Sequence, residues 1–269
     1  MGSFDLTALS VARDRLISVA FSHFSTDPDV LGMFISGSLA AKSSDAYSDI
    51  DLRVVVRTER HSWFAEHRRN FPQQWPGFLF NEWMPGTSHC VSHFRPFNKI
   101  DIFYLDAAKL TPSPWYRLPT IILHDPERIV ADLTNRSRDM TFTFTADDID
   151  VSISKGLAAA HETYRRAKRG ELFYSQTLMD ELRQHVMQSD DWLHGRTPET
   201  AVLAKFDRRS SPEVSQALTD SYCELDADMI LKALSHLLVV YRAQIVRLHE
   251  LFRLDRSIEN DLVASDICG

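Results

Sequence analysis

The chain has 269 residues, a formal net charge of −7, and a composition of 44% hydrophobic and 25% charged residues. This composition is typical of a globular protein with enough residues for one large domain or two ordinary domains. The acidic balance argues against a protein that grips nucleic acid by neutralising its phosphates, and it suits a small cationic substrate.

The sequence predicts a cytoplasmic protein. No apolar run reaches the length that a membrane span requires, and the N-terminus has no signal-peptide pattern. The three cysteines, Cys90, Cys223 and Cys268, are far apart and odd in number. We therefore expect free thiols in a reducing compartment.

Helices and strands alternate in the prediction for the first half of the chain. Apolar residues at helical spacing predict a helix over residues 6–24, which Asp27-Pro28-Asp29 ends. Apolar strand-like runs and proline or glycine breaks predict the other elements. These are strands at 30–36, 49–56, 78–83, 89–94, 99–105 and 120–124, a helix at 60–71, and an exposed loop or short helix at 42–48.

From about residue 145 the pattern becomes helical. The segment 145–148 resembles a capping box, and the apolar stripe that follows ends at Gly170. Further helices are predicted from Glu171 to about 194, within 198–222, and from Asp226 to about 254. The predicted fold class is therefore α+β, with a mixed-sheet domain over 1–142 and an all-α helical bundle domain over 143–269.

Two neighbouring segments carry residues that suit a metal-bound triphosphate. The strand predicted at 30–36 leads into Gly37-Ser38, where glycine permits close approach of a phosphate and serine can donate hydrogen bonds to it. Asp49 and Asp51 follow on the next strand and share one face, because side chains alternate along a strand. Two carboxylates on one face repel each other unless a cation lies between them, and Mg²⁺ prefers oxygen ligands.

This arrangement resembles the signature of the nucleotidyltransferase superfamily that includes DNA polymerase beta. The matching residues are Gly37, Ser38, Asp49 and Asp51. The superfamily also needs a third carboxylate on a neighbouring strand, and Asp101 is the candidate because it lies between two isoleucines in a strand-like run. The motif covers residues 34–104. The two-part layout further resembles the aminoglycoside and lincosamide nucleotidyltransferases, which pair a small catalytic sheet domain with a helical bundle.

The resemblance implies a Mg²⁺-dependent enzyme that transfers a nucleoside monophosphate, with ATP as the expected donor, to a hydroxyl of a small molecule. An aminoglycoside or lincosamide acceptor would make it an antibiotic-resistance protein. The resemblance assigns metal binding and catalysis to Asp49, Asp51 and Asp101. It assigns phosphate binding to Gly37 and Ser38.

Several roles stay open in the sequence. Asp101 either binds a second metal ion or acts as the general base, and Glu82, Glu171 and Glu181 are separate candidates for the base. Lys155, alone on its predicted helix near the domain junction, is the candidate for a further nucleotide contact.

The acceptor is expected between the carboxylate face of the sheet and the helices that begin near Asp148 and Glu171. A polycationic acceptor would require acidic lining there, from residues such as Glu171, Asp180 and Glu181. A mostly apolar acceptor would require aromatic lining instead.

Two other functions use the same motif. One is nucleotidylation of a protein or RNA end, as toxin–antitoxin nucleotidyltransferases and RNA-tailing enzymes do. The other is a nucleotide-binding module without catalysis. The acidic balance and the lack of a basic stripe argue against RNA, and the presence of three carboxylates argues against the module. The nucleotide preference and the oligomeric state stay open.

Overall fold

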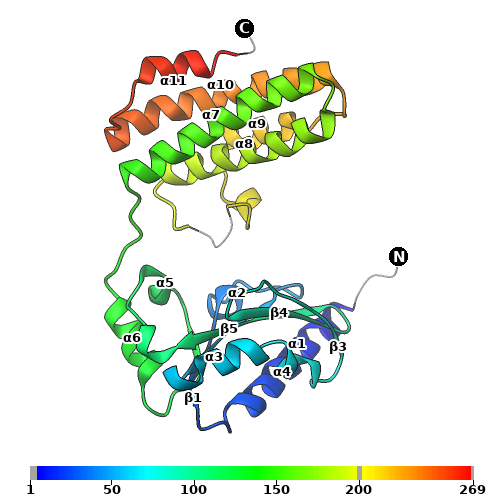
Figure 1. Ribbon diagram of the computed structural model, residues 1–269, viewed down its shortest axis with the longest axis vertical. Helices are drawn as coiled ribbons and strands as arrows, with labels where there is room; N and C mark the ends of the chain where they lie inside the picture. The colour runs from blue at the N-terminus through cyan, green and yellow to red at the C-terminus, as the bar shows by residue number, and fades with distance from the viewer. Residues whose placement is uncertain (1–4, 199–201, 268–269) are drawn as a thin grey trace. The chain divides into compact units, whose positions relative to one another are not determined.

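The computed structural model describes residues 5–198 and 202–267. The chain divides into two compact units, Met1–Thr141 and Phe142–Gly269 (Figure 1). The strands that the described residues form all lie in the first unit, and the described elements of the second unit are helices. The fold class is therefore α+β, as the sequence predicts.

A six-stranded mixed sheet forms the centre of the first unit, in the order β3-β4-β5-β2-β1-β6. The strands are β1 (Val30–Ser36), β2 (Ile50–Val56), β3 (Phe78–Glu82), β4 (His89–Phe94), β5 (Asn98–Asp106) and β6 (Ile121–His124). β2 and β5 are parallel neighbours, whereas the other neighbouring strands are antiparallel. Each predicted strand is present, and no end differs by more than one residue.

Short and long helices accompany this sheet. They are α1 (Leu6–Phe24), α2 (Gly37–Ala40), α3 (Thr58–His67), α4 (Asn70–Gln73), α5 (Pro114–Arg117) and α6 (Ile129–Ser137), with a 3-10 turn, η1 (Ala107–Lys109). The single helix predicted over 60–71 is wrong, because α3 ends at His67 and α4 begins at Asn70. Pro72 has no N–H to donate within a helix, and the restart places it in the first turn of α4, where it needs none.

Alternation along β2 and β5 divides their side chains between two faces. Ile50, Leu52 and Ile102 are at most 1% exposed and lie in an apolar core with side chains of α1 and α3. The opposite face bears Asp51, Arg53, Asp101 and Phe103, which are partly exposed, and we call it the carboxylate face. α6 packs on β1, and its Val130 joins a small cluster with Phe34 and Val55.

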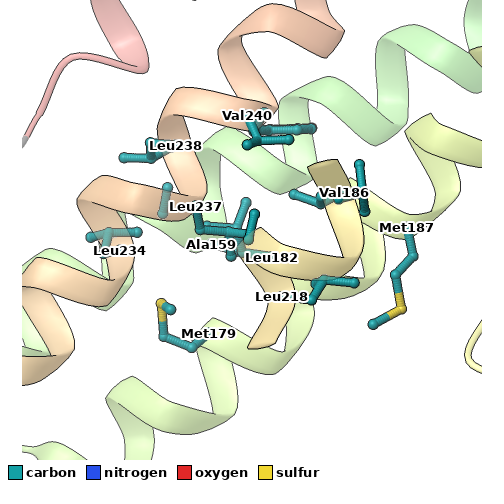
Figure 2. Close-up of a cluster of buried hydrophobic side chains, with 14 of the residues drawn as sticks. Ala159, Met179, Leu182, Val186, Met187, Leu218, Leu234, Leu237, Leu238 and Val240 are labelled. Carbon is teal, nitrogen blue, oxygen red and sulfur yellow. The ribbon is translucent and has the colours of Figure 1, made fainter. Parts of the chain in front are cut away.

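The second unit is a bundle of helices. They are α7 (Ala146–Lys168), α8 (Leu172–Leu193), α9 (Pro212–Ser221), α10 (Ala227–Phe252) and α11 (Ile258–Ala264), with a 3-10 turn, η2 (Phe206–Arg208). Figure 2 shows side chains of α7, α8, α9 and α10 in one core, among them Ala159, Leu182, Leu218 and Leu237. The predicted capping box of α7 is present between Thr145 and Asp148.

α10 is the described helix that is long and apolar enough to cross a membrane, by length and composition alone. Its most apolar window has a mean hydropathy of 1.4, so the expectation that no run reaches this length is wrong for α10. Of that window, 44% is buried inside the structure, and Leu234, Leu237 and Ile245 are fully buried in the helical core. Packing of this face against α7 and α8 accounts for its apolar side chains.

Two of the three cysteines lie within the described residues. Cys90 is buried on β4, and Cys223 is partly exposed after α9; both are free thiols, as predicted. Cys268 lies outside the described residues.

Candidate active site

The carboxylates that the sequence nominates lie close together in the first unit. Asp51 and Asp101 are register partners on the parallel strands β2 and β5. Asp49 directly precedes β2, and the Lys99 ammonium contacts both Asp49 and Asp101. The pairing of β2 with β5 therefore brings carboxylates from two separate segments to one place on the sheet.

Two basic side chains accompany these carboxylates. The Lys99 ammonium nitrogen lies 2.9 Å from Asp49 Oδ2 and 3.3 Å from Asp101 Oδ1. Arg53 Nη1 lies 3.5 Å from Asp51 Oδ1, and its guanidinium covers the Phe103 ring at 4.4 Å from the centroid. The negative charge on the carboxylate face is thus partly balanced by cations on the same strands.

Burial and neighbouring charge shift the pKa values at this site. Burial raises the pKa of the Asp101 carboxyl; Asp49 and Asp51 act in the same direction, and Lys99 opposes them. Burial lowers the pKa of the Lys99 ammonium, but Asp49 and Asp101 together outweigh this effect and the net pKa is raised. Lys99 therefore carries its charge at neutral pH.

The donor atoms at this site suit a hard divalent cation. Asp101 Oδ1 is buried and accepts no hydrogen bond; its only compensation among the described residues is the Lys99 ammonium at 3.3 Å, so a metal ion could use this oxygen as a ligand. Within 5–198 and 202–267, no group of three or more His, Cys, Asp or Glu side chains is arranged to hold a metal ion. Mg²⁺ in proteins is commonly held by one or two carboxylates together with substrate phosphates. The residues therefore fit a Mg²⁺ ion whose remaining ligands would be phosphate oxygens.

Gly37 lies directly against the Asp51 carboxylate. It is the first residue of α2, has a φ of +68°, and a Cβ placed on it would lie 1.9 Å from Asp51 Oδ2. Ser36, the residue before it, is the register partner of Asp51. Glycine is required here both for the left-handed backbone and for the close approach of the carboxylate.

Gly37→Ala is expected to lower the turnover of the transfer reaction proposed below about a hundredfold, because the new methyl group must displace Asp51 from its position. The left-handed backbone adds a destabilisation of about 1–2 kcal/mol. Gly86→Ala is the matched control, since Gly86 has a φ of +77° and nothing within 4 Å of an added Cβ. It should lose similar stability in thermal melts and keep full turnover. Equal turnover of the two variants would contradict the importance of the Gly37–Asp51 contact.

The other candidates of the first unit lie nearby on the chain or the sheet. Ser38 is the second residue of α2 and is partly exposed. Glu82 is the register partner of Val91, which in turn pairs with Asp101, so Glu82 lies two strands away in the same row of the sheet. Its carboxylate lies 3.5 Å from His93 Nε2.

The remaining candidates belong to the second unit. Glu171 is paired with Arg166 at 2.8 Å, and Asp180 with Arg183 at 2.6 Å. Lys155 and Glu181 both line a groove on α7 and α8 with a volume of about 590 Å³. The groove also contains carboxylates and apolar side chains, among them Asp148, Glu162, Val151, Leu178 and Trp192.

Lys99 and Arg53 were not among the residues nominated from the sequence. Each lies two positions from a nominated aspartate, Lys99 before Asp101 and Arg53 after Asp51. The period-two rule that placed Asp49 and Asp51 on one face also places these basic residues there. That signal could have predicted an internal ion pair at the site.

Three solved structures resemble this chain over most of its length. An aminoglycoside 6-adenyltransferase from Bacillus subtilis gives a TM-score of 0.46 at 11% identity, with 95% of this chain and 98% of the other covered. A nucleotidyltransferase-like protein from Exiguobacterium sibiricum gives 0.43 at 15% identity, with 91% and 80% covered. A CCA-adding enzyme in complex with CTP gives 0.33 at 14% identity, with 98% and 80% covered.

The expected resemblance to an aminoglycoside adenyltransferase and to a nucleotidyltransferase-like protein is found as a structural similarity, with TM-scores of 0.46 and 0.43. At these identities and TM-scores, the similarity assigns neither a family nor a substrate to this chain. No protein-family model matches the chain, and no curated protein matches it either.

Proposed function

We propose that this protein is an enzyme that transfers a nucleoside monophosphate, AMP from ATP as the expected case, to a hydroxyl of a small molecule. The acceptor oxygen forms a bond to the α-phosphorus. The bond from that phosphorus to the oxygen bridging to the β-phosphate breaks, and pyrophosphate leaves. The hydroxyl proton passes to a base.

The observation that supports this proposal best is the pairing of Asp51 with Asp101 on adjacent strands. The carboxylate of Asp51 also lies against Gly37. Phosphoryl transfer needs little covalent chemistry from a protein and depends on positioning and on stabilising developing charge. Carboxylates held by the register of two adjacent strands are rigidly positioned, which is what such a reaction requires.

Each nominated residue has a proposed role in this reaction. Asp49 and Asp51 hold Mg²⁺, which when bound supplies the charge that neutralises the triphosphate oxygens. Gly37 and Ser38 lie against the phosphates, and the nucleotide contact of Lys155, a residue of the second unit, stays a prediction from the sequence. Asp101 either completes the metal site or accepts the hydroxyl proton, for which its raised pKa is favourable.

The groove on α7 and α8 is our candidate for the acceptor site. Its volume of about 590 Å³ falls in the usual range for small-molecule sites. Three carboxylates and one ammonium line it, although Asp148 caps α7 and Glu162 pairs with Arg165. Among residues 5–198 and 202–267, no basic side chain forms an ion pair with Glu181, so its carboxylate is open to a ligand cation. Carboxylate and apolar side chains together suit an amino sugar, which favours an aminoglycoside over a lincosamide.

ATP is expected to bind at least about tenfold more tightly with Mg²⁺ than with EDTA, because bare triphosphate is repelled by Asp49 and Asp51. Calorimetric titration with a non-hydrolysable ATP analogue measures both affinities. Glu66→Gln is a control: it removes one negative charge at an exposed position of α3, away from the carboxylate face. It should change neither the affinity with Mg²⁺ nor the affinity with EDTA. Equal affinities with and without the metal would contradict the proposed metal site.

The acceptor is tested by incubating the protein with ATP, Mg²⁺ and a library of hydroxyl-bearing small molecules. Mass spectrometry should find an added adenylyl group on cationic amino sugars, and Glu181→Gln should weaken the apparent affinity for them. Adenylylation of apolar acceptors alone would contradict the assignment of the acceptor class.

A further inference from the structure

Lys99 lies where a cation shared by two site carboxylates would lie. Its ammonium nitrogen is 2.9 Å from Asp49 Oδ2 and 3.3 Å from Asp101 Oδ1, and the side chain is 35% exposed. Asp101 Oδ1 has no hydrogen-bond partner, so this ammonium is the nearest compensation for its charge. A divalent cation that used the same two carboxylates would need the space that the ammonium holds.

The strand geometry directs Lys99 to this position. Lys99 and Asp101 are two residues apart on β5 and share its carboxylate face. On the β4 side the register partner of Lys99 is His93, whose ring stacks on Phe80 at 4.2 Å between centroids. The ion-pair partners within reach of the ammonium are therefore Asp49 and Asp101.

We propose that Lys99 is a built-in competitor of the metal ion: its ammonium holds Asp49 and Asp101 when nucleotide is absent, and a divalent cation binds by displacing it. The inference rests on the proposed function, since it concerns the metal of the same site. A metal ion alone then binds weakly. A metal ion that arrives with a triphosphate binds better, because phosphate oxygens complete its coordination and offer the displaced ammonium an anion.

Mn²⁺ is a suitable probe, because free Mn²⁺ can be titrated by electron paramagnetic resonance without any turnover. In the absence of nucleotide, Lys99→Met is expected to bind Mn²⁺ about tenfold more tightly than the wild type, equivalent to about 1.4 kcal/mol. Lys99→Arg retains the charge and should bind as weakly as the wild type. Lys109→Met is the matched control, because Lys109 pairs with Asp106 at the other end of β5 and the substitution removes the same charge as Lys99→Met. It should bind Mn²⁺ like the wild type.

A second measurement tests the link to nucleotide. A non-hydrolysable ATP analogue should raise the Mn²⁺ affinity of the wild type by a larger factor than that of Lys99→Met. Without metal, Lys99→Met should melt at a lower temperature than the wild type because its carboxylates are left uncompensated. Added Mn²⁺ should raise the melting temperature of the variant and remove this difference. Lys99→Gln serves in the same measurements if the methionine variant does not fold.

The outcomes separate this inference from the proposed function. Equal or weaker Mn²⁺ binding by Lys99→Met, with binding still abolished by Asp49→Asn, would overturn the competition and leave the proposed metal site intact. Absence of Mn²⁺ binding by the wild type even with the analogue would overturn both proposals. Tighter binding by Lys99→Met and unchanged binding by Lys99→Arg and Lys109→Met would support the competition.

Discussion

Asp51→Asn is expected to lower turnover about a thousandfold, equivalent to about 4 kcal/mol of transition-state stabilisation, while the fold is kept. The amide has the shape of the carboxylate, so it still fits beside Gly37. The side chain is 26% exposed and its ion pair with Arg53 is long at 3.5 Å, so little stability depends on its charge. What the variant loses is a charged ligand for the metal that we propose.

Single-turnover kinetics with ATP and an identified acceptor measure this loss, and a thermal melt shows whether the fold survives. Glu66→Gln again removes one negative charge from α3, at an exposed position, and should keep wild-type turnover. Near-normal turnover of a folded Asp51→Asn protein would show that the site is assigned wrongly.

Asp190→Ala is expected to destabilise the second unit by about 3 kcal/mol, the largest stability effect that we predict for one side chain. Asp190 is 1% exposed near the end of α8. Its Oδ2 accepts from Arg196 Nη1 at 2.7 Å and from the Ser211 backbone N–H at 3.0 Å. Removal of the carboxylate leaves the Ser211 backbone N–H without its partner at the start of α9. It also removes the contacts through which α8 holds Arg196 and Ser211.

Urea denaturation at neutral pH measures this effect, with Asp207→Asn as an exposed acidic control that should stay within about 0.5 kcal/mol of the wild type. Burial acts to raise the pKa of Asp190, but the hydrogen bonds from Ser211 and Arg196 outweigh it and the net pKa is lowered. A lowered pKa means that the stabilisation is complete above the unfolded value of about 3.9 and is lost as pH falls through the folded value. The difference between wild type and Asp190→Ala should therefore shrink in acid. A difference that is constant from pH 7 down to pH 3 would contradict an ionic role.

Local pattern was sufficient for most of the elements. Alternation in the apolar strands predicted which side chains of β2 and β5 face the core, and Ile50 and Ile102 are indeed fully buried. The capping box at Thr145 likewise marked the start of α7. The structure confirms both predictions because each depends only on residues a few positions apart on one strand or one helical turn.

Elements whose signals are short or remote were missed or misread. α6 was not predicted, although its first turn is held by Asp125, whose carboxylate accepts from the backbone N–H groups of Val130 and Ala131. α11 has only seven residues, too few for a clear helical period. α10 was not recognised as apolar enough for a membrane span, although the helical spacing of its apolar residues predicted the face that packs against α7 and α8.

By itself the sequence determined the candidate residues and their faces, because the two-residue period of a strand and the chemistry of Gly-Ser and Asp-x-Asp are local properties. The tertiary structure alone decided that β2 pairs in parallel with β5, which sets Asp51 opposite Asp101. It alone decided that Gly37 touches Asp51 and that Lys99 lies between Asp49 and Asp101. The physical reason is that strand register is chosen by the packing of the whole apolar face, in which residues fifty positions apart become neighbours, and no local pattern specifies that choice.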